Sequence, residues 1–167
     1  MPVTVTVGVV LIIVLLGVSA FFSSTEIALF SLPSGDTGEG DSRTEALARL
    51  RENPHRLLVT ILVGNNVVNV AVSSIVTLLV AQRLSGGVAA VVATVVASML
   101  VLIFGEIIPK SYGLGNAENW ALRVARPMTV VSAVLYPVVA VFDGVTRRMS
   151  GAIGGDVGVE KTYDEDA

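Results

Sequence analysis

The sequence contains no cysteine, a single histidine (His55), and few charged residues. The missing thiols exclude disulfides, thiolate metal sites and a cysteine nucleophile. Only 15% of the 167 residues are charged and 53% are hydrophobic, whereas an ordinary soluble domain carries about a quarter charged residues. Together with a mean hydropathy of +0.76, this composition indicates a chain that folds in lipid.

Charge is also absent from long stretches of the chain. Met1 to Phe22 contains no charged residue, and Leu57 to Gly105 contains only Arg83. The net charge of -3 comes largely from the acidic residues at the C-terminal end, so the sequence offers no basic face suited to nucleic acid. We therefore expect several membrane spans, with the lipid bilayer as a partner and no nucleic-acid partner.

Three apolar stretches are long enough to cross a bilayer. The first, Val3 to Phe22, has 20 residues, which rise about 30 Å as a helix, and we expect this helix to continue to about Leu32. The second span covers Leu57 to Ala81 and the third covers Val88 to about Ile108. The polar segment Gly35 to Glu52 predicts a loop in water that contains a short helix.

The segment after the third span is expected to behave differently. Pro109 and the glycines of 113–115 predict that the third span ends or bends there, and Asn116 can cap the next helix. Met128 to Phe142 is apolar for only 15 residues and contains Pro137, which suits a re-entrant or interfacial helix better than a fourth span.

These features predict an all-α integral membrane protein. Each protomer has three transmembrane helices, a short cytoplasmic helical loop and a Pro-kinked juxtamembrane helix, forming one transmembrane domain over residues 1–150 that is followed by an acidic tail, 151–167. Lysine and arginine are concentrated in the loop after the first span and in the segment after the third. The positive-inside rule therefore predicts a multi-pass plasma-membrane protein with its N-terminus outside and its C-terminus in the cytoplasm.

Polar side chains inside the predicted spans point to a function. Asn65, Asn66 and Asn69 lie in an otherwise apolar helix, where an unsatisfied amide costs several kcal/mol. Asn65 and Asn69 are four residues apart and therefore share a helix face, which Ser73 continues. At 1.5 Å per residue they lie about 12 to 18 Å into the bilayer.

The other two spans offer oxygen atoms at similar depth. Ser19, Ser23 and Glu26 share a face of the first span, and Ser24 is adjacent to them. In the third span, Pro109 lacks an N–H and is expected to free the carbonyl of Gly105, next to Glu106. Hydroxyl, amide and carboxylate oxygens suit hard cations such as Mg²⁺, and an intramembrane carboxylate is by default a functional candidate.

The same residues have structural interpretations. Asparagine and serine often join transmembrane helices by hydrogen bonds. Glu26 could pair with Arg56 or Lys110, and Glu106 with Lys110 as an ordinary i, i+4 pair. An enzyme is not predicted, because no Ser-His, paired-Asp or zinc-binding pattern accompanies the glutamates.

Three segments make the sequence resemble the CorC and cyclin M-like (CNNM) magnesium transport proteins. They are FFSSTEIAL at 21–29, GNNVVN at 64–69 and GEIIPK at 105–110, and the resemblance covers roughly residues 3 to 150. It implies a homodimeric transmembrane domain with three spans and a juxtamembrane helix per protomer. Carried over by position, the Mg²⁺ ligands fall on Ser23, Asn65, Asn69, Gly105 and Glu106, with Ser24, Glu26, Asn66 and Ser73 as secondary candidates.

The function implied by the resemblance is export of Mg²⁺ from the cytoplasm, coupled to Na⁺ influx. Members of the family usually continue into a pair of cytoplasmic CBS domains, and the acidic tail 151–167 resembles the start of a linker to such a pair. The alternative function is a membrane-anchored magnesium sensor or scaffold that regulates partners without moving ions.

Overall fold

The computed structural model describes residues 3–32 and 42–153, and this part of the chain is helical apart from short turns. Helix α1 (Val3–Ser31) is followed by α2 (Ser42–Arg51) and α3 (Pro54–Ala81). The next helix has three parts, α4 (Gly86–Leu100), the π-helix η1 (Val101–Ile107) and α5 (Ile108–Gly115), and α6 (Ala117–Ile153) completes the fold. The predicted tail 151–167 lies mostly outside the described residues.

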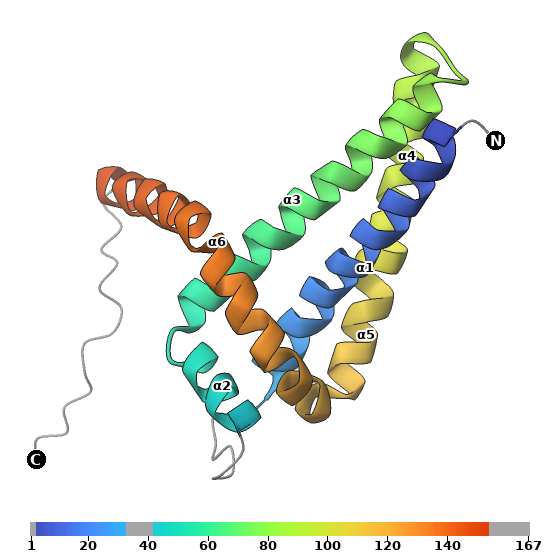
Figure 1. Cartoon of the computed structure of the whole chain (residues 1–167). Helices are drawn as coiled ribbons and strands as arrows, with labels where there is room; N and C mark the ends of the chain where they lie inside the picture. Colours follow the sequence, from blue (N-terminus) through green and yellow to red (C-terminus); the bar gives the residue numbers. More distant parts are fainter. Residues whose placement is uncertain (1–2, 33–41, 154–167) are drawn as a thin grey trace, which may run out of the picture.

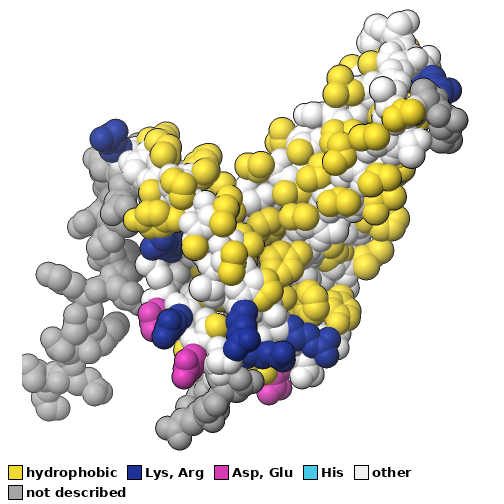
Figure 2. All heavy atoms as spheres, in the orientation of Figure 1, with side chains coloured by type: hydrophobic (Ala, Val, Ile, Leu, Met, Phe, Trp, Pro, Cys, Tyr) yellow, Lys and Arg dark blue, Asp and Glu magenta, His cyan; other side chains and the backbone are white. Residues whose placement is uncertain are grey.

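Helices α1, α3 and the continuous α4–η1–α5 helix form a bundle (Figure 1). Helix α1 runs antiparallel to α3, so the N-terminus lies at the same end as the α3–α4 hairpin, and α2 lies at the other end. The outer surface of these helices is covered with exposed valine, leucine and isoleucine side chains (Figure 2). The arrangement confirms an all-α fold with an apolar exterior, as expected in lipid.

Two clusters of buried apolar side chains hold the bundle together. Near the hairpin end, Ile12, Val72, Val76 and Ala97 join α1, α3 and α4. At the α2 end a second cluster joins α1, α2, α3 and α6 through residues that include Phe22, Leu47, Ile61, Ala125 and Met128. Along α1 and α3, the polar cluster described below lies between residues of these two apolar clusters.

The predicted end of the third span at about Ile108 is wrong, because the helix continues through Pro109. It ends at Gly115, within the segment 113–115 that was expected to end or bend it, and a seven-residue π-helix interrupts its α-helical bonding. At the end of the π segment the N–H of Ile108 bonds to the carbonyl of Ile103, five residues back. Pro109 then lies in the first turn of α5, where a missing N–H costs little.

Small residues allow this helix to pack closely on its neighbours. Buried positions lie four residues apart, or eight in one case, at Ala93, Ala97, Gly105, Pro109 and Gly113. Because an α-helix has 3.6 residues per turn, such a stripe winds by about 40° per step. The stripe accordingly leaves α3, against which α4 packs, and reaches α1, against which η1 and α5 pack.

The last helix begins directly after Asn116, as expected. Helix α6 is one helix of 37 residues that contains Pro127 and Pro137, so the apolar run Met128 to Phe142 is only part of it. It crosses α3 at a steep angle and changes direction in its second half (Figure 1), where Pro137 removes a backbone donor. Asn116 does precede α6, but its side-chain amide donates to the Tyr112 carbonyl of α5 at 3.1 Å.

In the part of the chain that the structure describes, four helical stretches are long and apolar enough to cross a membrane: Val3–Ser31, Pro54–Ala81, Gly86–Gly115 and Ala117–Thr146. The first three are the predicted spans. The fourth lies in α6, for which the sequence predicts an interfacial position, so the count of three spans stays a prediction.

Gly113 tests the close packing of α5 on α1. A Cβ atom at this position would collide with the backbone carbonyl oxygen of Ser24, which moves only if the helices separate. We expect Gly113→Ala to destabilise the fold by about 1 to 3 kcal/mol, the usual cost of overpacking, measured as a lower thermal unfolding midpoint in detergent. Gly115→Ala, with nothing within 4 Å of its Cβ, is the matched control, and equal midpoints for the two variants would contradict the packing described.

Candidate metal centre

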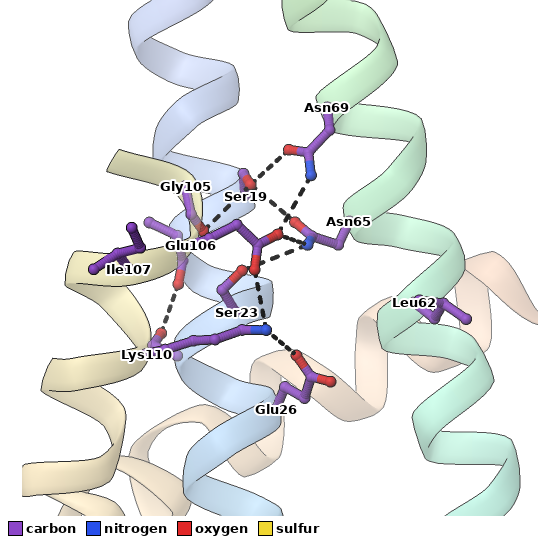
Figure 3. A network of polar contacts seen from close by, with 12 residues as sticks. Ser19, Ser23, Glu26, Leu62, Asn65, Asn69, Gly105, Glu106, Ile107 and Lys110 are labelled. Atoms are coloured by element: carbon purple, nitrogen blue, oxygen red, sulfur yellow. Dashed lines mark hydrogen bonds and ion pairs between the residues drawn. The ribbon is translucent and has the colours of Figure 1, made fainter. Parts of the chain in front are cut away.

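A cluster of polar side chains lies where α1, α3 and the π-helix meet (Figure 3). Ser19 and Ser23 come from α1, Asn65 and Asn69 from α3, and Gly105 and Glu106 from η1. Because α1 and α3 are antiparallel, the i, i+4 pair on one helix faces the i, i+4 pair on the other. Ser19 contacts both asparagines, and Ser23 contacts Asn65.

Glycine makes the approach of the helices possible. A Cβ atom on Gly105 would lie 2.6 Å from Ser19 Oγ, and one on Gly64 would collide with the Phe22 ring. Each glycine therefore leaves room for a side chain of α1 to lie directly against its helix.

The hydroxyl of Ser19 is surrounded by more acceptors than it can serve. Its Oγ lies 2.9 Å from Asn65 Oδ1, 2.8 Å from Asn69 Oδ1 and 3.5 Å from the carbonyl oxygen of Gly105. A serine hydroxyl carries one proton, so most of these oxygens face one another without a hydrogen between them. Ser19 is completely buried, and four oxygens from three helices with one proton form a site suited to a cation.

Glu106 fixes which way the two amides point. Its Oε1 accepts from Asn65 Nδ2 at 2.6 Å and from Asn69 Nδ2 at 3.5 Å. Because a carboxylate only accepts, the Asn65 amide must turn its NH₂ group to Glu106 and its oxygen to Ser19. The Asn69 amide has the same orientation in this structure, at a longer distance from Glu106. In this structure Glu106 therefore orients the oxygen cluster from behind, in the way that outer-shell carboxylates orient metal ligands.

A lysine lies on the other side of the Glu106 carboxylate. Lys110 Nζ is 3.0 Å from Glu106 Oε2 and 3.1 Å from Glu26 Oε2. Side-chain exposure rises from Glu106 (21%) to Glu26 (32%) and Lys110 (40%), whereas Ser19 and Ser23 have none. The cluster is thus open toward the α2 end of the bundle and closed around Ser19.

The structure brings together the five predicted ligands, Ser23, Asn65, Asn69, Gly105 and Glu106, and the secondary candidate Glu26. Their role as metal ligands stays a prediction. The sequence allowed Glu26 to pair with Arg56 or with Lys110, and the structure contains the pair with Lys110. The Arg56 guanidinium instead lies 4.3 Å from the centre of the Tyr136 ring.

Three secondary candidates lie outside the cluster. Ser24 Oγ donates to the Ala20 carbonyl and accepts from Trp120 Nε1 at 3.0 Å, so it joins α1 to α6. Asn66 is exposed and its amide donates to the Leu62 carbonyl. Ser73 donates to the Asn69 carbonyl, one turn toward the hairpin.

Ser19 is the residue of the cluster that sequence reasoning did not select as a ligand, although it had been placed on the same face as Ser23. The comparison of depth favoured Ser23, which does lie opposite Asn65. The spacing itself contained the missing information, because a partner for Asn69 must lie one turn from Ser23 in an antiparallel helix, and that position is Ser19.

The chemistry of the cluster is that of neutral oxygen. In the described part of the chain no three His, Cys, Asp or Glu side chains are grouped to hold a metal, so an acidic cage of the kind used for Ca²⁺ is not found there. Hydroxyl, amide and backbone carbonyl oxygens are ligand types that suit hard cations.

A double-mutant cycle tests the contact between the π-helix and α1. We expect Gly105→Ala alone to destabilise the protein by about 1 to 3 kcal/mol, because the added methyl group would press against Ser19 Oγ. Combining it with Ser19→Ala removes that oxygen and should recover part of the loss. Unfolding midpoints of the four proteins in metal-free detergent give the coupling energy, and strictly additive effects would show that the two residues do not touch.

Comparison with known proteins agrees with the resemblance found in the sequence. A family model described as the cyclin M transmembrane N-terminal domain matches residues 10–166. The chain is 38% identical over 128 residues to a chloroplastic DUF21 domain-containing protein of Arabidopsis thaliana, covering 75% of this chain and 19% of that protein.

Two further relatives carry more informative names. The chain is 28% identical over 141 residues to the UPF0053 inner membrane protein YfjD of Escherichia coli, covering 82% of this chain and 33% of that protein. It is 30% identical over 141 residues to metal transporter cnnm-4 of Caenorhabditis elegans, covering 77% of this chain and 30% of that protein. The chain thus spans a third or less of these three relatives. With its apolar helices and a match to the family model over nearly all its length, it is a multi-pass membrane protein that belongs to the cyclin M (CNNM/CorC) family.

Proposed function

We propose that this chain is the transmembrane module of a divalent-cation transporter that exports Mg²⁺ from the cytoplasm. The observation that carries the proposal is the set of four oxygens, contributed by three helices, that share one hydroxyl proton around the buried Ser19. Such a set is costly in lipid unless a cation occupies it. The name of the Caenorhabditis elegans relative, a metal transporter, supports this class of function over an enzyme.

Mg²⁺ is the proposed substrate because the cluster offers oxygen ligands alone. Mg²⁺ prefers oxygens at about 2.0 to 2.1 Å and gives up its water reluctantly. The proposed ligands are Ser19, Asn65, Asn69 and the Gly105 carbonyl, with Ser23 beside Asn65 available as a further hydroxyl. Glu106 holds the amides in orientation and contributes negative charge.

Access to the cluster supports a path across the bilayer. On the α2 side, the exposed Glu26 and Lys110 form an entrance. On the other side, a groove of about 760 Å³ between α3 and α4 begins at Asn69 and continues past Ser73 and Thr77 toward the hairpin. In the proposed mechanism the ion sheds water onto the cluster from the cytoplasm, and the helices then rearrange around Gly64 and the π-helix to open the groove side.

The same groove supports a homodimer. Its lining includes Asn66, Ser74 and Thr77, which are exposed at membrane depth. Each donates to a carbonyl of its own helix, but their side-chain oxygens still face the apolar surroundings. A second copy packed over this face would cover them, and it would supply the two-fold symmetry that a single chain without internal repeats lacks.

We further propose three spans per protomer, with α6 at the cytoplasmic surface. The cavity on one side of its crossing with α3 is lined by Arg49, Arg56 and Tyr136, among others, whereas the cavity on its other side is lined by apolar residues such as Val67, Val130 and Leu135. A helix between a basic and an apolar layer suits the membrane interface. This orientation places the N-terminus outside the plasma membrane, and it puts CBS domains, in a longer protein, on the cytoplasmic side.

Removing one proposed ligand should weaken Mg²⁺ binding. We expect Asn69→Ala and Ser19→Ala to lower Mg²⁺ affinity by about 10- to 100-fold, the range typical of damaged metal sites, measured by isothermal titration of the purified protein. Asn66→Ala is the matched control, since its amide bonds only to its own helix among the contacts described. If Asn69→Ala binds Mg²⁺ as tightly as the wild type, the ligand assignment is wrong.

Ion flux distinguishes a transporter from a magnesium sensor or scaffold. We expect the protein in sealed liposomes to move Mg²⁺, with a rate that rises when Na⁺ is supplied on the side opposite to Mg²⁺, and we expect Asn69→Ala to abolish this flux. A fluorescent Mg²⁺ indicator inside the liposomes gives the measurement. Tight binding without flux would favour the sensor, and flux that is indifferent to Na⁺ would remove the proposed coupling.

A further inference from the structure

Lys110 shares a carboxylate with the proposed metal site. One oxygen of Glu106 accepts the Asn65 amide at 2.6 Å, and the other lies 3.0 Å from the Lys110 ammonium. The ammonium also contacts Glu26 at 3.1 Å. Figure 3 shows the three charged side chains in a row that leads from the asparagines toward the α2 end of the bundle.

The charges in this row decide how strongly a cation is held. Two carboxylates and one ammonium leave a single net negative charge beside a cluster of neutral oxygens. Two arginines on adjoining elements make other contacts, Arg51 with the Leu32 carbonyl and Arg56 with the Tyr136 ring. Among the contacts described, Lys110 is the cation that pairs with both carboxylates and would oppose a metal ion at this site.

An arrangement without Lys110 would match a divalent ion better. Two carboxylates would balance its charge, whereas the ammonium leaves the loaded site with excess positive charge. In a partly dehydrated site this repulsion is large, because Coulomb energies rise as the effective dielectric constant falls. A site for transport also has to release its ion, so binding that is too tight would slow turnover.

We propose that Lys110 sets the affinity of the site, lowering it for divalent cations so that the ion can leave. Lys110 acts through charge and through its hold on Glu106, and it touches none of the proposed ligand oxygens among the contacts described. This role rests on the proposed function, since it requires that a cation binds around Ser19.

An ordinary salt bridge predicts the opposite effect. If Lys110 only held Glu106 in place, its removal would let the carboxylate turn away from Asn65 and Asn69, and the affinity for Mg²⁺ would fall. The sign of the change therefore separates the two roles.

The test is a charge cycle on the purified full chain, read out by isothermal titration with Mg²⁺. Lys110→Gln should bind Mg²⁺ at least about tenfold more tightly than the wild type, and Glu26→Gln should bind it more weakly. The double variant, which restores the original net charge, should bind close to the wild-type affinity. Lys110→Arg, which keeps the charge, should stay closer to the wild type than Lys110→Gln does.

Two further measurements keep the outcome clear. Arg83→Gln removes a positive charge at the opposite end of the bundle, in the turn after α3, and should leave the affinity unchanged if the effect is local. Thermal unfolding shows whether each variant is folded, and Glu26→Gln tests the idea alone if Lys110→Gln does not fold. In liposomes, Lys110→Gln should show a lower maximal Mg²⁺ flux despite its tighter binding.

The failures of the two proposals are distinguishable. A folded wild-type protein that binds no Mg²⁺ overturns the proposed function. A wild type that binds Mg²⁺, together with a folded Lys110→Gln variant whose affinity is equal or lower, overturns the role of Lys110 and leaves the proposed function intact. The same holds if Glu26→Gln binds more tightly than the wild type.

Discussion

The excess of hydrogen-bond acceptors over donors around Ser19 is the constraint on which the rest of the structure depends. Two amide oxygens and a backbone carbonyl lie within 3.5 Å of one hydroxyl, in a bundle whose outer surface is apolar. Water is the usual remedy for such an excess of acceptors, but Ser19 itself has no exposed surface. In the proposed function a cation corrects the imbalance, and Glu106, which accepts from the Asn65 amide at 2.6 Å, opposes rotation of that amide.

Close helix approach is the condition for this arrangement. Ser19 and Gly105 come together because Gly105 has no side chain, and the same is true of Phe22 on Gly64 one layer nearer α2. The Trp120 to Ser24 hydrogen bond then joins α6 to α1 beside the entrance. Movement of α6 would therefore be felt at the cluster through one short stretch of α1, a connection that suits control of the site from the α2 end of the bundle.

Much of the candidate metal centre could be predicted from the sequence, because polar groups in lipid need hydrogen-bond partners and helical spacing gives the face on which each residue lies. The depth and i, i+4 spacing of Asn65 and Asn69 predicted that they would act together, and Pro109 drew attention to the Gly105 carbonyl. Ser19 was passed over because depth alone could not rank two serines one turn apart. Asn116 gave the start of α6, but the apolar run Met128 to Phe142 did not give its length, because the helix also packs in the second apolar cluster through residues before that run, such as Ala121 and Ala125.

The continuation of the third span through Pro109 was missed for a related reason. A proline was taken to end the helix, but the preceding π-helix had already changed the bonding pattern, so the proline falls in a first turn. The four-residue recurrence of small residues, from Ala93 to Gly113, was visible in the sequence and favours a helix that continues.

The π-helix has one more consequence, which concerns rotational phase. A bond from residue i to i+5 accommodates one surplus residue relative to an α-helix, and each residue of an α-helix turns the chain by about 100°. The segment before Val101 and the segment after Ile107 are therefore offset by most of a third of a revolution. If the π-helix changed to α-helical bonding, Glu106 and Lys110 would rotate together about the helix axis while α4 stayed packed on α3. Such a local change could turn the charged row away from the asparagines.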